Sequence, residues 1–81
     1  MDIETLAGHL DLWRRLARDI DDLVERRRAT LSLRELEGSD TSQARQALND
    51  SEELQRKIWG DKEQLETEFR ELLEKRQGHG Q

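Results

Sequence analysis

The feature that most constrains this chain is a run of apolar residues, spaced by alternating threes and fours, across its first 31 residues. This spacing is a heptad repeat, whose a and d positions share one face of an α-helix. A β-strand would need apolar residues at every second position, and no stretch alternates in that way. We therefore predict a long helix that packs lengthwise against other helices. Its seam comprises Ile3, Leu6, Leu10, Trp13, Ala17, Ile20, Val24, Arg27 and Leu31, of which Arg27 alone is polar.

The composition is typical of an ordered helical protein with a thin core. Of the 81 residues, 41% are charged and 32% are hydrophobic, and a chain of this length forms one small domain. It contains no proline, so nothing forces a break inside a helix. A low apolar fraction permits disorder, but disordered segments lack a sustained apolar seam. The fold class that follows is all-α.

Charge and cysteine content exclude several classes of function. The net charge of −5 argues against general binding to nucleic acids or to anionic membranes. A chain without cysteine has no disulfide framework, zinc knuckle or thiol chemistry, and it fits a reducing compartment. The first four residues are acidic rather than basic, and no apolar run is long enough for a signal peptide or a membrane span. We expect a cytoplasmic protein.

One strong break divides the chain into two helices. Gly38 suits the left-handed position that follows a helix, and Asp40 with Gln43 has the spacing of a capping box for the next helix. A short turn between long helices implies an antiparallel hairpin. We expect this hairpin to pair into a four-helix bundle or coiled-coil assembly. The predicted domain covers residues 1–76, with a first helix over about 2–36, a turn over 37–41 and a second helix over about 41–76, and a flexible tail follows over 77–81.

The second helix has its own apolar repeat and one point of weakness. Ile58, Leu65 and Leu72 recur at intervals of seven residues, as a seam requires. Gly60 and Asp61 interrupt this pattern, because glycine weakens a helix interior and aspartate favours a cap. We predict a helix that is kinked at Gly60–Asp61, with a true third helix as the alternative.

The hairpin predicts which residues face one another. If the turn centres near Ser39–Asp40, the numbers of facing residues sum to about 79. The polar seam residue Arg27 then falls opposite Ser51–Glu52, and we predict that Arg27 pairs with Glu52. The second helix contributes Glu52, Ile58, Leu65, Phe69 and Leu72 to the predicted seam.

Besides Leu33 and Leu36, where the register falters, three large apolar residues of the first helix lie outside its a/d seam. Leu12, Leu16 and Leu23 widen the apolar face beyond what a two-stranded contact covers. Burying one leucine side chain is worth roughly 1.5–3 kcal/mol, so a partner that covers this surface gains stability. Trp59 is the best single candidate for an anchor in that contact, because tryptophan is enriched at binding hot spots. The predicted partner is a second copy or a foreign helical protein.

No group of residues points to catalysis, a cofactor or a metal. The carboxylates of Asp19, Asp21, Asp22 and Glu25 diverge around a helix, and the chain lacks a Glu-x-x-His pair. A thin hairpin offers no cleft for acid–base chemistry. The sequence therefore predicts a non-enzymatic protein with neither a catalytic residue nor a cofactor.

The predicted function is a small helical protein–protein interaction module, either a homodimer or an adaptor subunit of a larger assembly. One alternative is a small acidic inhibitor, such as a phage-encoded anti-defence factor, which blocks a nucleic-acid-binding surface. A remote alternative is an all-helical mutase-type enzyme, suggested by the arginines and the Ile20–Asp21 pair within residues 16–28. In that alternative, Ala17 stands where the active site needs an arginine.

Overall fold

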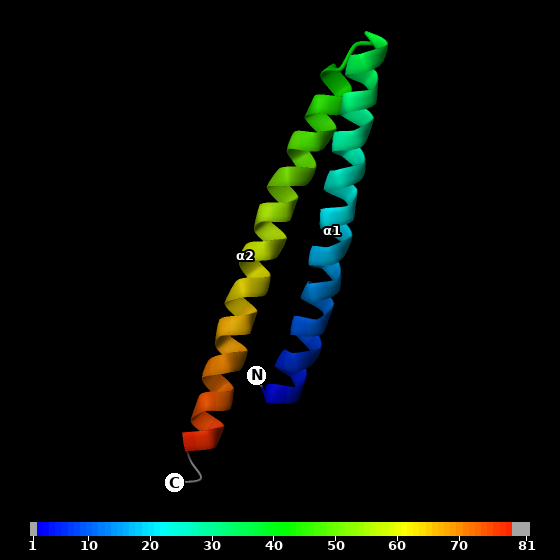
Figure 1. The fold of residues 1–81 in the computed structure, drawn as a ribbon. Helices are drawn as coiled ribbons and strands as arrows, with labels where there is room; N and C mark the ends of the chain where they lie inside the picture. The colour runs from blue at the N-terminus through cyan, green and yellow to red at the C-terminus, as the bar shows by residue number, and fades with distance from the viewer. Residues whose placement is uncertain (1, 79–81) are drawn as a thin grey trace.

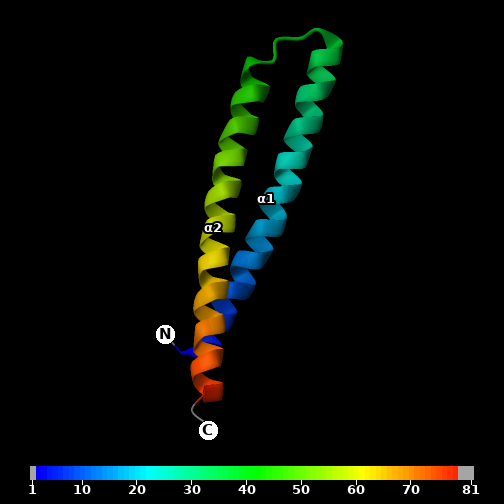
Figure 2. The ribbon, with the colours of Figure 1, turned by 60° about the vertical axis from the view of Figure 1, so that its left-hand side comes forward.

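The computed structural model describes residues 2–78 as two long antiparallel helices (Figure 1). Helix α1 spans Ile3–Glu37 and helix α2 spans Ser42–Gly78. The two helices lie side by side in both views (Figures 1 and 2) and form a rod of 66 × 17 × 14 Å. The predicted all-α hairpin is thereby confirmed. Helix α2 extends two residues beyond its predicted end, and residues 79–81 of the predicted tail lie outside the described residues.

The ends of the helices are closed by local hydrogen bonds. The Asp2 carboxylate accepts a bond of 2.7 Å from the backbone N–H of Thr5, which caps α1. At the other end of α1, Gly38 adopts the left-handed conformation with φ at 74°, which a residue without a Cβ takes at little cost. The Asp40 carboxylate accepts bonds from the backbone N–H and the hydroxyl of Ser42. These contacts form the turn where the sequence predicted it, but they are not the predicted capping box, because Asp40 accepts from Ser42 rather than from Gln43 and α2 begins at Ser42.

The third helix considered as the alternative at Gly60–Asp61 does not form, because α2 continues through this point as one uninterrupted helix. Its ribbon passes the yellow region without a sharp bend in either view (Figures 1 and 2). A glycine inside a helix costs only about 1 kcal/mol relative to alanine. The seam residues Ile58 and Leu65 flank the glycine and pack against α1 on either side of it, and that packing outweighs the local preference.

The core is a single line of side chains between the two helices. Its centre is a cluster of Ala17, Ile20, Val24 and Ile58. Three half-buried residues, Trp13, Leu23 and Leu48, pack against this cluster. Leu6 and Leu10 continue the buried line toward the N-terminus. The other predicted seam residues keep part of their surface in solvent because two helices leave both sides of the seam open. These half-buried members are Ile3, Trp13, Arg27, Leu31, Glu52, Leu65, Phe69 and Leu72.

Candidate interaction surface

The hairpin has two flanks of different chemistry on either side of its seam. In α2, the seam alternates between Leu48, Gln55, Lys62 and Phe69 at position a and Ala44, Ser51, Ile58, Leu65 and Leu72 at position d. In an antiparallel pair, the e positions of the two helices then face each other on one flank, and the g positions face each other on the opposite flank. We call the e side the polar flank.

Polar contacts across the helices join e residues along most of the polar flank, and only the e pair nearest the termini, Ala7 and Leu73, is apolar. The residue numbers of each pair sum to 80, which confirms the predicted register of about 79. All three interhelical ion pairs within residues 2–78 lie here. The pairs are Arg14–Glu66, Asp21–Trp59, Arg28–Glu52 and Glu35–Arg45.

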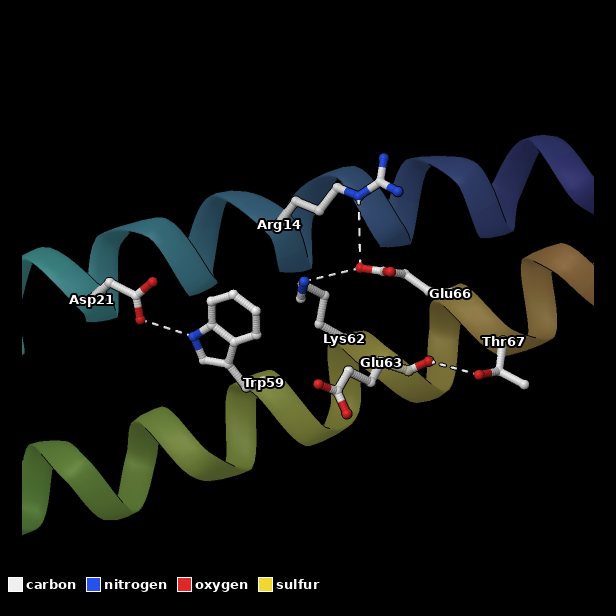
Figure 3. Close-up of polar contacts among 7 residues, drawn as sticks. All are labelled: Arg14, Asp21, Trp59, Lys62, Glu63, Glu66 and Thr67. Atoms are coloured by element: carbon white, nitrogen blue, oxygen red, sulfur yellow. Dashed lines mark hydrogen bonds and ion pairs between the residues drawn. The ribbon is translucent and has the colours of Figure 1, made fainter.

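Trp59 is held at the centre of the polar flank. Its indole N–H donates a hydrogen bond of 2.8 Å to Asp21 Oδ1 on α1 (Figure 3). Gln55 Nε2 donates to the same oxygen at 2.9 Å, so one carboxylate of α1 binds two side chains of α2. The residue keeps 37% of its surface exposed. Trp59 therefore ties the two helices together, which the sequence did not predict.

A lysine connects the tryptophan to a neighbouring carboxylate. Lys62 Nζ lies 4.0 Å from the centroid of the Trp59 ring, a cation–π contact, and 3.0 Å from Glu66 Oε1. Arg14 Nε approaches the same oxygen at 4.0 Å from α1 (Figure 3). The hydrogen bond from Lys62 holds the pKa of the Glu66 carboxyl below its usual value, and the positive charges of Lys62 and Arg14 act in the same direction.

The opposite flank carries the apolar residues that the sequence assigned to a partner. Leu12 and Leu16 are 54% and 37% exposed, while Leu23 is half-buried against the core cluster. Leu54 of α2 is 48% exposed and occupies the g position that faces Leu23. Sequence reasoning missed Leu54, although the register would have found it once the g positions of α2 were assigned. We call Leu12, Leu16, Leu23 and Leu54 the leucine flank.

Trp59 and the leucine flank do not form one surface, contrary to the prediction that Trp59 anchors the same contact. Trp59 binds Asp21, and Asp21 lies about 140° around α1 from Leu16 at 3.6 residues per turn. The seam lies between them.

The predicted Arg27–Glu52 pair is also wrong. Arg27 Nη1 donates to the backbone oxygen of Ala47 at 2.7 Å and to the hydroxyl of Ser51. Glu52 instead accepts from Arg28 at 3.3 Å on the polar flank. Successive residues of a helix point about 100° apart, so Ser51 faces the seam where Arg27 lies and Glu52 turns out of it.

Two arginines line a groove at the turn end of the leucine side. The groove has a volume of about 240 Å³, and its walls include Arg27, Arg34 and Thr30 of α1. Within residues 2–78, neither arginine forms an ion pair with a carboxylate. The nearby Asp50 carboxylate accepts a hydrogen bond from Gln46 instead. Of the residues that the structure describes, two arginines and no carboxylate line this groove, and the heptad pattern did not predict it.

The described residues hold no group of three or more His, Cys, Asp or Glu side chains placed to bind a metal ion. Neither α1 nor α2 has an apolar stretch long enough to cross a lipid bilayer. Comparison of the chain with protein-family models, curated proteins and solved structures finds no match. Its function must therefore be argued from the two flanks alone.

Proposed function

We propose that this chain is a non-enzymatic helical interaction module, which docks through its leucine flank onto the helices of another protein molecule. The observation that carries the proposal is the difference between the two flanks. Cross-helix hydrogen bonds and ion pairs span most of the polar flank, where Trp59 and Leu73 are the partly exposed apolar residues. The leucine flank exposes Leu12, Leu16 and Leu54 and has no such polar contacts between its g residues within residues 2–78. Such a surface is typical of one side of a helical bundle.

The energetics favour a partner that covers all of these leucines together. Moving a leucine side chain from water into an apolar contact is worth roughly 1.5–3 kcal/mol, and association costs at least about 4 kcal/mol in lost freedom of motion. A single exposed leucine does not offset that cost. Leu12, Leu16 and Leu54 are only about half exposed, so the three of one copy gain roughly 2–4 kcal/mol when covered. The six leucines of two copies gain roughly 4–8 kcal/mol, which offsets the lower end of the cost, and a second copy brings such a surface. A cytoplasmic homodimer is therefore our default assembly.

The test is the molecular mass of the purified protein in solution, measured by light scattering. The paired substitution Leu16→Glu and Leu54→Glu alters only exposed positions, so each helix keeps its buried seam. We expect the unmodified protein to be dimeric and the double variant to be monomeric with its helical circular dichroism retained. Leu36→Glu is the matched control, because Leu36 is 86% exposed on the outer face, and this variant should remain dimeric.

A monomeric unmodified protein at high micromolar concentration would exclude self-association. A foreign helical protein would then be the partner, and capture by the unmodified chain but not by the double variant would identify the leucine flank as its contact. The alternative function, an acidic inhibitor of a nucleic-acid-binding protein, predicts a different result. Its binding would weaken steeply with salt and would not depend on Leu16 and Leu54.

A further inference from the structure

We propose that the second copy docks on the leucine flank with its turn at the opposite end, so that its Glu68 and Glu71 enter the groove lined by Arg27 and Arg34. This inference rests on the function proposed above and adds the direction and the polar contacts of the assembly. It follows from the charges on the two halves of the leucine side and from the register of the leucines.

The half of the leucine side near the turn offers cations that lack acidic partners. Arg27 is half-buried and binds only the neutral oxygens of Ala47 and Ser51. Arg34 lines the same groove. A partly desolvated guanidinium forms its strongest hydrogen bonds with a carboxylate, and within residues 2–78 the groove receives none. The groove is therefore suited to an acidic side chain from outside the hairpin.

The half near the termini offers the matching anions. Asp61 and Glu68 are g residues of α2, and Glu71 lies one turn further at position c, on the same side as the leucines. Glu68, Glu71 and Lys75 line a shallow groove near the end of the rod, and both carboxylates are exposed. The two halves of the leucine side therefore differ in charge, with arginines near the turn and, near the termini, the three carboxylates of Asp61, Glu68 and Glu71 against the one lysine Lys75.

The leucines set the register of an inverted second copy. A two-fold axis that crosses the rod midway between Leu16 and Leu23 brings Leu16 of one copy beside Leu23 of the other. Two α1 residues of different copies then lie at the same height along the rod when their numbers sum to 39. Thr30, which lies between Arg27 and Arg34, is then at the same height along the rod as residue 9 of the second copy. On the leucine side of one hairpin, α1 and α2 residues that face each other have numbers that sum to 77. Residue 9 therefore lies at the same height as Glu68 of its own chain. The same axis brings the level of Arg34 within one residue of Glu71.

A second copy with its turn at the same end would place like charges together. A two-fold axis along the rod places each residue at the same height as its counterpart in the second copy. The arginine grooves of the two copies would then adjoin, and so would the glutamates. Juxtaposed like charges cost free energy and disfavour that arrangement. The inverted arrangement also keeps Asp61 away from Asp61 of the second copy.

The direction can be measured with one spin label on each chain. The chain contains no cysteine, so Ser39→Cys provides a single labelling site in the exposed turn. Double electron–electron resonance should give a separation of about 60 Å between labels in the inverted dimer, at 1.5 Å per residue. A same-end dimer should give about 20 Å, the width of two adjacent helices. The short distance would overturn the inverted arrangement and leave the proposed function standing, whereas a monomer would overturn self-association itself.

The polar contact has its own test in a charge exchange. Arg34→Glu should weaken dimerisation about tenfold, since it places a carboxylate against Glu68 and Glu71 of the second copy. Adding Glu71→Arg to the same chain should restore the dimer. Arg18→Glu makes the same change in charge at an exposed residue beside the polar flank, and it should leave the dimer unaffected. Failure of the exchange to restore the dimer would overturn the contact.

Discussion

Arg27 of α1 reaches across the seam and donates hydrogen bonds to the hydroxyl of Ser51 and the backbone oxygen of Ala47 on α2. Ser51 is buried and small, so it leaves room for the guanidinium between the two helices. Its hydroxyl also donates to Ala47 O at 2.8 Å. One polar layer thus interrupts an otherwise apolar line, and both helices contribute to it.

Ser51→Ala should lower the free energy of unfolding by about 1–3 kcal/mol, because it removes one acceptor from a half-buried guanidinium. The double variant Arg27→Met with Ser51→Ala should recover most of that loss, since an apolar pair leaves no polar group unsatisfied. Urea unfolding followed by circular dichroism measures both changes. If Ser51→Ala unfolds like the unmodified protein, the contact contributes nothing.

The Trp59–Asp21 hydrogen bond should be visible as an energetic coupling between the helices. Trp59→Phe removes the indole N–H and keeps an aromatic ring, and Asp21→Ala removes the acceptor. In a double-mutant cycle, we expect a coupling of about 0.5–1.5 kcal/mol in the free energy of unfolding. Asp19→Ala is the matched control, because Asp19 is exposed outside the polar flank, and its coupling to Trp59→Phe should be zero.

Replacing Gly60 and Gly38 by alanine should change the free energy of unfolding in opposite directions. Gly60 lies in the interior of α2, and a Cβ added there meets no atom within 4 Å. Gly60→Ala should therefore raise the free energy of unfolding by about 0.5–1 kcal/mol. Gly38→Ala should lower it, because its positive φ of 74° strains a residue with a Cβ. Thermal unfolding compares the two variants directly, and destabilisation by Gly60→Ala would contradict the continuous helix.

Acid should weaken the hairpin partly through Glu66. Its pKa is lowered in the folded state by the hydrogen bond from Lys62. A lowered folded pKa stabilises the fold fully above the unfolded value of about 4.3, and this contribution is lost as the pH falls through the folded value. Glu66→Gln should therefore flatten the fall in unfolding free energy below a pH of about 5. Glu63→Gln is the control on the exposed face of α2, and an equal effect from both variants would contradict the assignment.

The apolar pattern of the sequence was sufficient to predict the hairpin and its register. Leucines spaced by threes and fours define one face of each helix, and Gly38 marks the point where the chain reverses. A seam of this length aligns two helices to within one residue, because a larger shift would misplace every apolar contact. Whether the helix bends or breaks at Gly60 could not be judged in the same way, because a local preference of about 1 kcal/mol competes with packing that only the folded hairpin reveals.

Predicting the polar contacts requires a register that is exact to one residue, which the apolar pattern does not provide. An error of one residue in register moves a side chain by about 100° around its helix. That difference separates Ser51, which binds Arg27, from Glu52, which binds Arg28. Trp59 was misplaced for a related reason, since an aromatic residue next to a seam can lie on either flank. Only the structure places its indole N–H against Asp21.

The antiparallel arrangement of α1 and α2 has a consequence for how the chain folds. Contacts near the turn join residues close in sequence, and the separation grows steadily toward the ends, from Glu35–Arg45 to Arg14–Glu66. Closing a longer loop costs more chain entropy, so contacts near the turn are the least expensive to form. Folding should therefore proceed like a zipper from Gly38 outward. The contacts between the first turns of α1 and the final turns of α2 close last. The backbone amides of these turns should therefore be the first to exchange their protons with solvent.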